Sequence, residues 1–509
     1  MESHSSRTRW LHSTECFQYA AFYDARTSAN ASVRYVSIAR RELSATKNLD
    51  GAGEWETLTL KDYAQTDDDG HNVISLGISS KTGSIHLGFD QHDNDLNYRV
   101  SKPGVATNPH NTTWSSAIFG PVVNVLPGLE GLDLPAHFEN VTYPRFLSIP
   151  SPTEGSPSAN PEADLLLEMR VGRAGLGDDW LYAYVPDEEG ESGNWTLIGK
   201  YLEGVNNNAY INGLDFDLSR TLHTSWTYRD YINDTGQDVA VEAGPNGPEN
   251  NHDLAYASSA DLGNTWINSW GQIVSVLAEG ANKSMGALEG PIDPDSPGIT
   301  VFSIPKYGGI LNQEAQTIDS AGRFHVLNRE NTTGIEQWYH YWRTPSPQAF
   351  WVRSPLPLNI REDPNNVTGT PTVIGKRGKL VAVSSNSKFN DTALGEEETT
   401  YLLAILPSNA PNSTALSILA ATSKTPALSA ASTSYLAQFT DWSVVWSVAN
   451  GSSPGTSAAE PLFDRYRLAQ DGVLSLFLVS GVSGEDAMQS SAGSGNITVV
   501  DLDLSGLFN

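Results

Sequence analysis

Four strand-like runs of the chain end in residues that could bind an anion or move a proton. His92, Arg170, Arg229 and Arg329 follow successive apolar runs at similar places. The whole chain has 59 acidic and 31 basic residues, so cations repeated in register are not expected from its composition. Arginine binds a carboxylate with two parallel N–H groups, and histidine exchanges protons near neutral pH. The pattern therefore predicts an anion-binding site.

The other histidines divide by position. His86, His223 and His325 each follow the first apolar residue of their run, and a position repeated in this way predicts packing. His71 lies instead in the turn-rich segment DDDGHN at 67–72, before the strand that leads to His92. These two histidines are the candidates for proton transfer. Catalytic zinc is the weaker hypothesis, because neither has a cysteine or close histidine partner at zinc spacing, so the metal stays unknown.

Such residues need a scaffold that brings distant loops together. Short runs rich in Val, Ile, Leu, Phe, Tyr and Trp alternate with Gly, Asn, Asp and Pro clusters, which is typical of strands and turns. Seven runs recur roughly 70 residues apart: 19–23, 85–89, 165–169, 222–228, 324–327, 380–383 and 474–479. The repeat predicts an all-β fold, a seven-bladed β-propeller of four-stranded antiparallel blades. Counting alone leaves six or eight blades open.

One propeller domain is expected to span 16–509, after a disordered or extended segment at 1–15. The Pro- and Ser-rich stretch 150–161 predicts a surface loop. The last strand-like run, 497–504, is expected to pair with the N-terminal blade and close the ring. The segment SADLGNTW at 259–266 matches the Asp-box, a hairpin turn whose Asp and Ser tie down the loop while its Trp packs between blades. The predicted role of this motif is structural.

Charge and composition exclude several function classes. The formal net charge of −28 repels nucleic acid and anionic membranes, so we expect neither as a partner. The sequence contains no run of 18 apolar residues, so no membrane-spanning helix is expected. With Cys16 as its one cysteine the chain has no intrachain disulfide, and packing must hold the core. We expect a monomer.

Sites for N-glycosylation are frequent. The N-x-Ser/Thr sequons begin at Asn30, Asn111, Asn140, Asn194, Asn233, Asn282, Asn331, Asn366, Asn390, Asn412, Asn450 and Asn496. Their density predicts a secreted protein, although the printed sequence shows no apolar signal region at its start. A cytoplasmic origin stays open.

Several segments, taken in order, resemble the BNR-repeat β-propeller family. They are DDDGHN (67–72), SIHLGFDQHDNDLNYRVS (84–101), TYPRF (142–146), EMRVGRAG (168–175), AYINGL (209–214), HTSWTYRD (223–230), NHDLAYASSADLGNTW (251–266), NQEAQTIDSAGRFHVLNR (312–329) and WYHYWR (338–343). The resemblance spans about 16–355, and no motif beyond it matches. That family includes the propeller ulvan lyases. The chain is most similar to the fungal L-rhamnose-α-1,4-D-glucuronate lyases (polysaccharide lyase family 42), which release terminal rhamnose from gum arabic-type or arabinogalactan-type glycans.

The resemblance implies a β-eliminating site on one face of the propeller. It places two pocket histidines at His71 and His92, a pocket tyrosine at Tyr143 and a carboxylate-facing arginine at Arg170. The residues expected to bind substrate are Arg229, Asn72, Tyr98, Tyr210, Asn212, Arg329 and His340. The partner is then an oligo- or polysaccharide that contains a uronate.

β-Elimination from a uronate needs these residue types. A base removes the proton on carbon 5, beside the carboxylate, and the oxygen on carbon 4 leaves. Arginine can neutralise the carboxylate, which makes the proton more acidic. Histidine can act as the base, and the same histidine or a tyrosine can protonate the leaving oxygen. The chemistry needs no cofactor. A structural calcium ion could brace the axis, but the sequence shows no ligand set for it.

Two other functions stay open. Sialidase-like glycoside hydrolases also carry Asp-boxes and an arginine cluster, and YPRFLSIP at 143–150 resembles their Phe/Tyr-Arg-Ile-Pro motif. One clean Asp-box is fewer than those enzymes show. A non-catalytic sugar-binding propeller would repeat one site in every blade, whereas the polar residues here differ from blade to blade.

Overall fold

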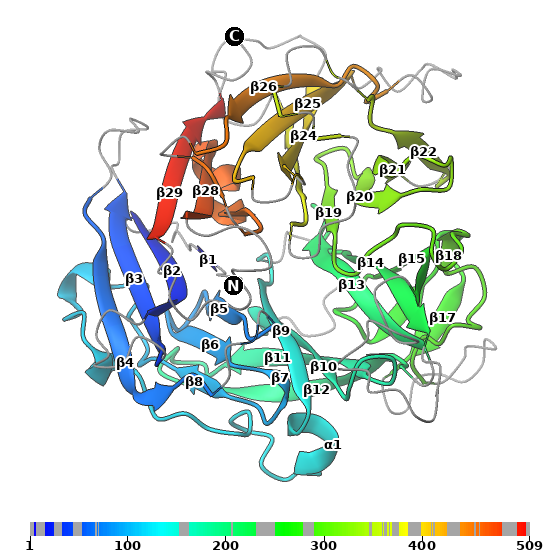
Figure 1. The fold of residues 1–509 in the computed structure, drawn as a ribbon. Coiled ribbons are helices and arrows are strands. Elements are labelled where there is room, and N and C mark those ends of the chain that lie inside the picture. Colours follow the sequence, from blue (N-terminus) through cyan, green and yellow to red (C-terminus); the bar gives the residue numbers. More distant parts are fainter. Residues whose placement is uncertain are drawn as a thin grey trace.

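A computed structural model shows a ring of seven antiparallel sheets, seen along its axis in Figure 1. The structure describes residues 5–6, 16–24, 33–43, 53–66, 69, 71–151, 162–204, 207–230, 250–277, 290–345, 349–358, 360, 364–365, 367–368, 376–384, 399–408, 410, 413–424, 438–451, 455–457, 459–480 and 496–504. Most of the expected loop at 150–161 and of the segment 1–15 lies outside them. Seven sheets confirm the seven-bladed propeller.

The sheets follow one another in chain order with one exception. The first holds β1 (Ser5–Ser6), β2 (Cys16–Asp24), β3 (Tyr35–Leu43) and β4 (Glu56–Ala64). The second holds β5 (Ile74–Ile78), β6 (Ile85–Phe89) and β8 (Tyr98–Val100). The third holds β7 (His92–Asn94), β9 (Val141–Ser148), β10 (Leu165–Val171), β11 (Asp178–Pro186) and β12 (Gly193–Leu202). The chain thus visits the third sheet at β7 before it completes the second.

The remaining four sheets are built in the same way. The fourth holds β13 (Asn207–Phe216), β14 (Leu222–Asp230), β15 (Asn251–Ser259), β16 (Thr265–Ile267), β17 (Ile273–Val276) and β18 (Thr300–Phe302). The fifth holds β19 (Ala315–Ile318), β20 (Phe324–Glu330), β21 (Gln337–Arg343) and β22 (Trp351–Pro355). The sixth holds β23 (Lys379–Ser384), β24 (Thr399–Pro407), β25 (Leu416–Lys424) and β26 (Ser443–Val448). The seventh holds β27 (Leu462–Phe463), β28 (Val473–Ser480) and β29 (Asn496–Asp503).

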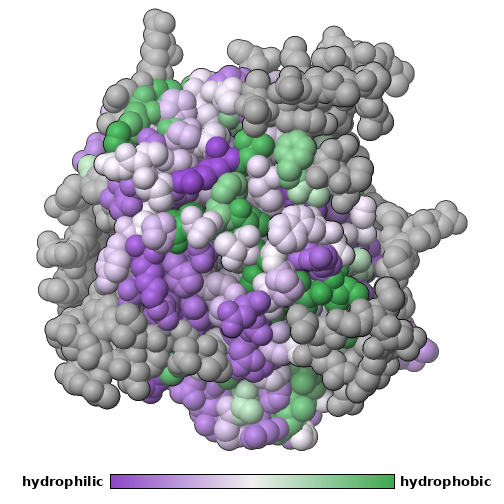
Figure 2. All heavy atoms as spheres, turned by 90° about the vertical axis from the view of Figure 1, so that its right-hand side faces the viewer, coloured by the Kyte–Doolittle hydropathy of each residue, from purple (hydrophilic) through white to green (hydrophobic). Residues whose placement is uncertain are grey.

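Three of these sheets have the expected four strands, and in the described chain the others have three to six. The helices are short: α1 (Leu134–Phe138), α2 (Arg465–Asp471) and the 3₁₀ turns Pro109–Asn111 and Ser116–Ile118. None of the helices that the structure describes is long and apolar enough to cross a membrane. In the side view of Figure 2, hydrophobic residues reach the surface in separate groups among hydrophilic ones.

Packing between neighbouring sheets holds the ring together. One core cluster joins Leu181 of the third sheet to Trp226 of the fourth, and another joins Leu403 of the sixth to Leu476 of the seventh. Each sheet therefore buries both faces, which explains why whole strands can be buried, polar residues included. All residues of β6 and of β20 are buried, for example.

The Asp-box and the repeated histidines are structural, as expected. Ser259 Oγ donates to Asp261 Oδ1 at 2.8 Å, and the fully buried Trp266 stacks on Tyr201 of the third sheet with ring centroids 5.1 Å apart. The histidines His86, His223 and His325 are all buried. These positions therefore support packing between blades.

The ring does not close by the strand pairing that the sequence suggested. β29 pairs with β28 along its whole length, and no described strand of the N-terminal blade pairs with its other edge, so the expected pairing of 497–504 is wrong for the described residues. Strands adjacent in the chain preferentially pair with each other. Side chains make the closure instead: Arg41 Nη2 lies 2.8 Å from Asp501 Oδ2, and Gln18 Nε2 donates to Asp464 Oδ2 at 2.9 Å.

Candidate active site

A buried carboxylate brings the two candidate histidines together. Asp90 ends β6 in the left-handed backbone region, with φ 57°, and its side chain accepts hydrogen bonds from Thr66 and Asn72. Of the segment 67–72 the structure describes residues 69, 71 and 72. Asp90 thus ties the loop that carries His71 to the turn that delivers His92 into β7. The crossing from the second to the third sheet therefore creates the site.

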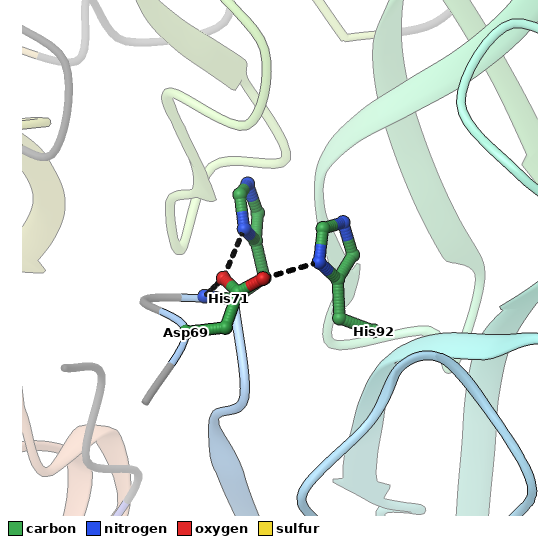
Figure 3. A group of neighbouring side chains, drawn as sticks. All are labelled: Asp69, His71 and His92. Atoms are coloured by element: carbon green, nitrogen blue, oxygen red, sulfur yellow. Dashed lines mark hydrogen bonds and ion pairs between the residues drawn. The ribbon is translucent and has the colours of Figure 1, made fainter. Parts of the chain in front are cut away.

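His71 and His92 are stacked and share one carboxylate. Their ring centroids are 4.0 Å apart and their planes differ by 21°. His71 Nδ1 lies 2.6 Å from Asp69 Oδ1, and His92 Nδ1 lies 2.7 Å from Asp69 Oδ2 (Figure 3). The side chains are 49% and 30% exposed, so both can meet a ligand. In Figure 3 the Nε2 atoms of both rings point away from Asp69.

Asp69 remains ionised in this arrangement. Burial raises the pKa of its carboxyl, but the hydrogen bonds from His71 and His92 outweigh burial and hold the pKa well below its usual range. A carboxylate accepts hydrogen bonds and donates none. Each neutral imidazole must therefore keep its hydrogen on Nδ1 and present a bare Nε2.

A β-bulge turns Tyr143 toward the histidines. The pairing of β9 with β10 shifts between Glu168 and Arg170, opposite Tyr143 and Pro144, and Tyr143 has a positive φ of 57°. Bulges re-aim side chains, and a bulky residue in this backbone region is uncommon. The ring centroid of Tyr143 lies 6.1 Å from that of His71.

Tyr143 keeps its proton at neutral pH. Burial and the neighbouring Tyr210 raise the pKa of its phenol to about 12, although three nearby arginines oppose the rise. These arginines are Arg170, Arg377 and Arg229. The tyrosine can therefore donate a proton or a hydrogen bond.

Arg170 lies behind Tyr143 and is almost fully buried. Its guanidinium is 5.1 Å from the Tyr143 ring, and it donates to Thr142, to Tyr210 and to the backbone of Gly172. Its contact with an exposed group is the one to Asp93 Oδ1, at 3.3 Å. Burial alone would lower the pKa of Arg170, but Tyr210, Tyr143 and Asp93 raise it above its ordinary value. Arg170 is therefore positively charged at neutral pH.

Arg229 and Tyr210 extend the same surface. The Arg229 guanidinium lies 4.4 Å from the Tyr210 ring and donates to Asn251 and Asn312. Tyr210 in turn packs edge-on against Tyr143, with ring centroids 6.3 Å apart. The structure therefore brings together His71, His92, Tyr143, Arg170, Tyr210 and Arg229.

A polar cavity of about 80 Å³ opens beside Tyr143. Six of the seven sheets, or the segments leading into them, supply its lining: Val73, Tyr143, Pro144, Arg145, Asn212, Gln313, Glu314, Arg377, Lys379 and Glu460. The expected substrate-binding residue Asn212 is among them. Arg377 donates to Gln313 at 2.8 Å and is ion-paired with Glu460.

Sequence reasoning missed Asp69 and three lining residues beyond the span of the resemblance. Arg377, Lys379 and Glu460 all lie in the last third of the chain, where no motif matches. The available signal was Gly378, which precedes the sixth repeated strand as Gly83, Gly322 and Gly472 precede three of the others.

Four predicted binding residues lie elsewhere. Tyr98 is buried, and its hydroxyl bonds to His86 and Trp195. His340 is fully buried, with Nε2 3.0 Å from His325 Nδ1. Tyr98 and His340 were expected to bind substrate. Because both are buried in the core, that expectation is wrong.

The other two support residues of the site from behind. Asn72 is buried and donates to Asp90 at 2.8 Å. Arg329 is fully buried and donates to the cavity residue Glu314 at 3.1 Å. Both residues therefore act through their neighbours rather than on a ligand.

Asp69, His71 and His92 are also the one group of described residues that could hold a metal ion. Their ligand atoms lie within 4.8 Å of one another. Two imidazoles and a carboxylate suit Zn²⁺. In the structure these same atoms are joined by the two hydrogen bonds to Asp69.

Comparisons with known proteins agree with this fold. The BNR repeat-containing family matches residues 17–356. The polysaccharide lyase Uly1 superposes with a TM-score of 0.56 at 15% identity, over 97% of this chain and 88% of its own. A PL25 ulvan lyase gives a TM-score of 0.51 at 11% identity, over 99% and 97%. No curated protein sequence is significantly similar to the chain.

Proposed function

This chain belongs to the BNR repeat-containing family, and we propose that it is a polysaccharide lyase that cleaves a glycosidic bond to a uronic acid by β-elimination. The assembly of His71, His92 and Arg170 around Tyr143, which also lines the cavity, carries the proposal. The two similar structures are named as polysaccharide lyases, one of them an ulvan lyase, which agrees with it.

The uronate carboxylate would bind at the edge of Arg170 that contacts Asp93. The other groups that Arg170 contacts are backbone or largely buried, whereas Asp93 is exposed and its contact is long, at 3.3 Å. A substrate carboxylate can take this place and pair with the guanidinium. Neutralising the carboxylate stabilises the negative charge that develops as the proton on carbon 5 leaves.

His92 would act as the base. It offers a bare Nε2, and its Nδ1 hydrogen bond to Asp69 stabilises the imidazolium that forms when it takes the proton. The C5–H electrons form the double bond between carbons 4 and 5, and the bond from carbon 4 to the glycosidic oxygen breaks. Tyr143, or His92 once it carries the proton from carbon 5, would give that oxygen a proton. The site needs no cofactor for these steps.

The finer substrate we propose is L-rhamnose at the end of an α-1,4-linked D-glucuronate, as in gum arabic and arabinogalactan-type glycans. The motif resemblance supports it. Incubation with a rhamnose-capped glucuronate glycan and, separately, with ulvan tests it. Free rhamnose from the first is expected. If ulvan gives an unsaturated product and the rhamnose-capped glycan does not, the proposed reaction stands and the proposed substrate is wrong.

We also propose that the protein is secreted, glycosylated and monomeric. The sequon residues Asn111, Asn140, Asn194, Asn331 and Asn450 are all exposed, which supports modification. The sequons at Asn30, Asn233, Asn282, Asn366, Asn390 and Asn412, and the side chain of Asn496, lie outside the described residues. A loss of mass on enzymatic removal of N-glycans from protein made in a secretory host is the expected result.

A further inference from the structure

Asp69 bonds to both histidines of the pair, and we propose that it is a positioning residue that gives both imidazoles the same tautomer and the same direction. This inference rests on the proposed function for its catalytic meaning. The geometry is direct, because each carboxylate oxygen accepts from one Nδ1, at 2.6 Å for His71 and 2.7 Å for His92.

The carboxylate is itself held in place. Asp69 Oδ1 also accepts the backbone N–H of His71 at 2.8 Å, and the Asp69 carbonyl accepts the N–H of Asn72 at 3.1 Å. Asn72 is anchored to the buried Asp90. The side chain of Asp69 is about one third exposed, so its orientation depends on these bonds rather than on close packing.

The stacking of the rings follows from this arrangement. Two imidazoles that donate to the two oxygens of one carboxylate lie nearly parallel, with centroids 4.0 Å apart (Figure 3). Both Nε2 lone pairs then point away from Asp69 (Figure 3), and the Tyr143 ring lies 6.1 Å from that of His71. Two proton-accepting nitrogens are thus available at one place without any change of tautomer.

The variant Asp69→Asn separates positioning from mere folding. An amide has one accepting oxygen and one donating nitrogen. One histidine can therefore keep Nδ1–H, while the other must accept at Nδ1 and carry its hydrogen on Nε2. Because the backbone N–H of His71 also donates to Oδ1, the amide oxygen should keep that place, so His92, the proposed base, is the ring that takes the wrong tautomer.

Ring ¹⁵N shifts distinguish a protonated from a bare imidazole nitrogen and need no substrate. We expect Nδ1–H on both His71 and His92 in the wild type, with signals assigned from His71→Gln and His92→Gln. In Asp69→Asn one of the two should change to Nε2–H. Nε2–H on either ring of the wild type, or an unchanged spectrum in the variant, would overturn the inference. The wild-type spectrum decides this even if the variant does not fold.

Kinetics supply the second readout. Asp69→Asn should lower kcat by roughly 10²–10⁴-fold, as expected for a general base held in the wrong tautomer, with little change in KM. Asp217→Asn is the matched control, because Asp217 also bonds a histidine, His223, but in the turn between β13 and β14. It should lower stability and leave kcat unchanged. Equal kcat in wild type and Asp69→Asn would contradict the inference.

The two proposals can fail separately. If no uronate glycan is cleaved but the spectra change as described, Asp69 keeps its positioning role and the lyase proposal fails. If cleavage occurs and Asp69→Asn changes neither tautomer nor kcat, the lyase proposal stands and the role of Asp69 is refuted.

Discussion

Arg170 Nη2 lies 3.3 Å from Asp93 Oδ1, and Asp93 directly follows the candidate base His92 in the chain. An exposed carboxylate of the protein thus occupies the edge of the arginine at which the substrate carboxylate is proposed to bind. The two negative groups would compete for one cation.

Asp93→Asn should therefore strengthen binding of a uronate substrate. Removing one negative charge from a partly exposed site corresponds to a decrease in KM of roughly 3- to 10-fold. Asp95→Asn makes the same charge change at an exposed position two residues away and should leave KM nearly unchanged. A KM that falls equally in both variants would point to overall charge rather than competition at Arg170.

His92→Ala should reduce turnover by roughly 10²–10⁴-fold, the usual contribution of general acid–base catalysis. His86→Ala serves as its control, because His86 is fully buried and bonded to Ser84 and Tyr98. That variant should lose melting temperature while the folded fraction keeps its kcat. Similar losses of kcat in both variants would show that the division of the histidines is mistaken.

Arg170→Lys keeps the charge and loses the planar fork. Turnover should fall roughly 10²-fold or more, because a lysine cannot reproduce the pairing with a carboxylate or the bonds to Thr142 and Tyr210. The measurement is kcat/KM on the folded variant. Wild-type activity in this variant would show that Arg170 does not take part in the reaction.

Asp501→Asn tests how the ring closes. Asp501 contacts both Arg41 and Arg467 and is 10% exposed, so its loss should cost about 3 kcal/mol in the free energy of unfolding. Glu56→Gln, which removes an exposed partner of Arg40, should cost less than about 1 kcal/mol.

The effect of Asp501 should depend on pH. Burial raises the pKa of this carboxyl, but Arg41 and Arg467 lower it overall. A depressed folded pKa means that the stabilisation is complete above the ordinary carboxyl pKa of about 4 and is lost as pH falls through the folded value. The gap between wild type and Asp501→Asn in denaturant unfolding should therefore narrow below pH 4. A constant gap would contradict the ion pair.

The seven blades could be predicted from sequence because each needs an apolar strand buried on both faces, and the register of those strands places His92, Arg170 and Arg229. The pairing of β29 could not be predicted, because an apolar run shows that a segment is a strand but not which strand it pairs with. Asp69 is one of three consecutive aspartates, and the sequence does not show which of them contacts the histidines. Arg377 and Glu460 could not be predicted as cavity residues, because they lie in blades that share no motif with the rest of the site.

Tyr98 and His340 show the opposite error. Both lie in segments that resemble the family, but each blade is buried on both faces, so a place in a matching strand does not by itself bring a side chain to the cavity. Tyr98 packs against Trp195 and His340 against Phe439 in the interior.

The absorbance and oxygen content of the products test the central claim most directly. A lyase forms a double bond conjugated with the uronate carboxylate and consumes no water. We predict that a rhamnose-capped glucuronate glycan in ¹⁸O-labelled water, with a chelator present, gives rising ultraviolet absorbance and free rhamnose without the label. Labelled sugar without absorbance would contradict elimination and identify a hydrolase, and binding without any product would identify a lectin.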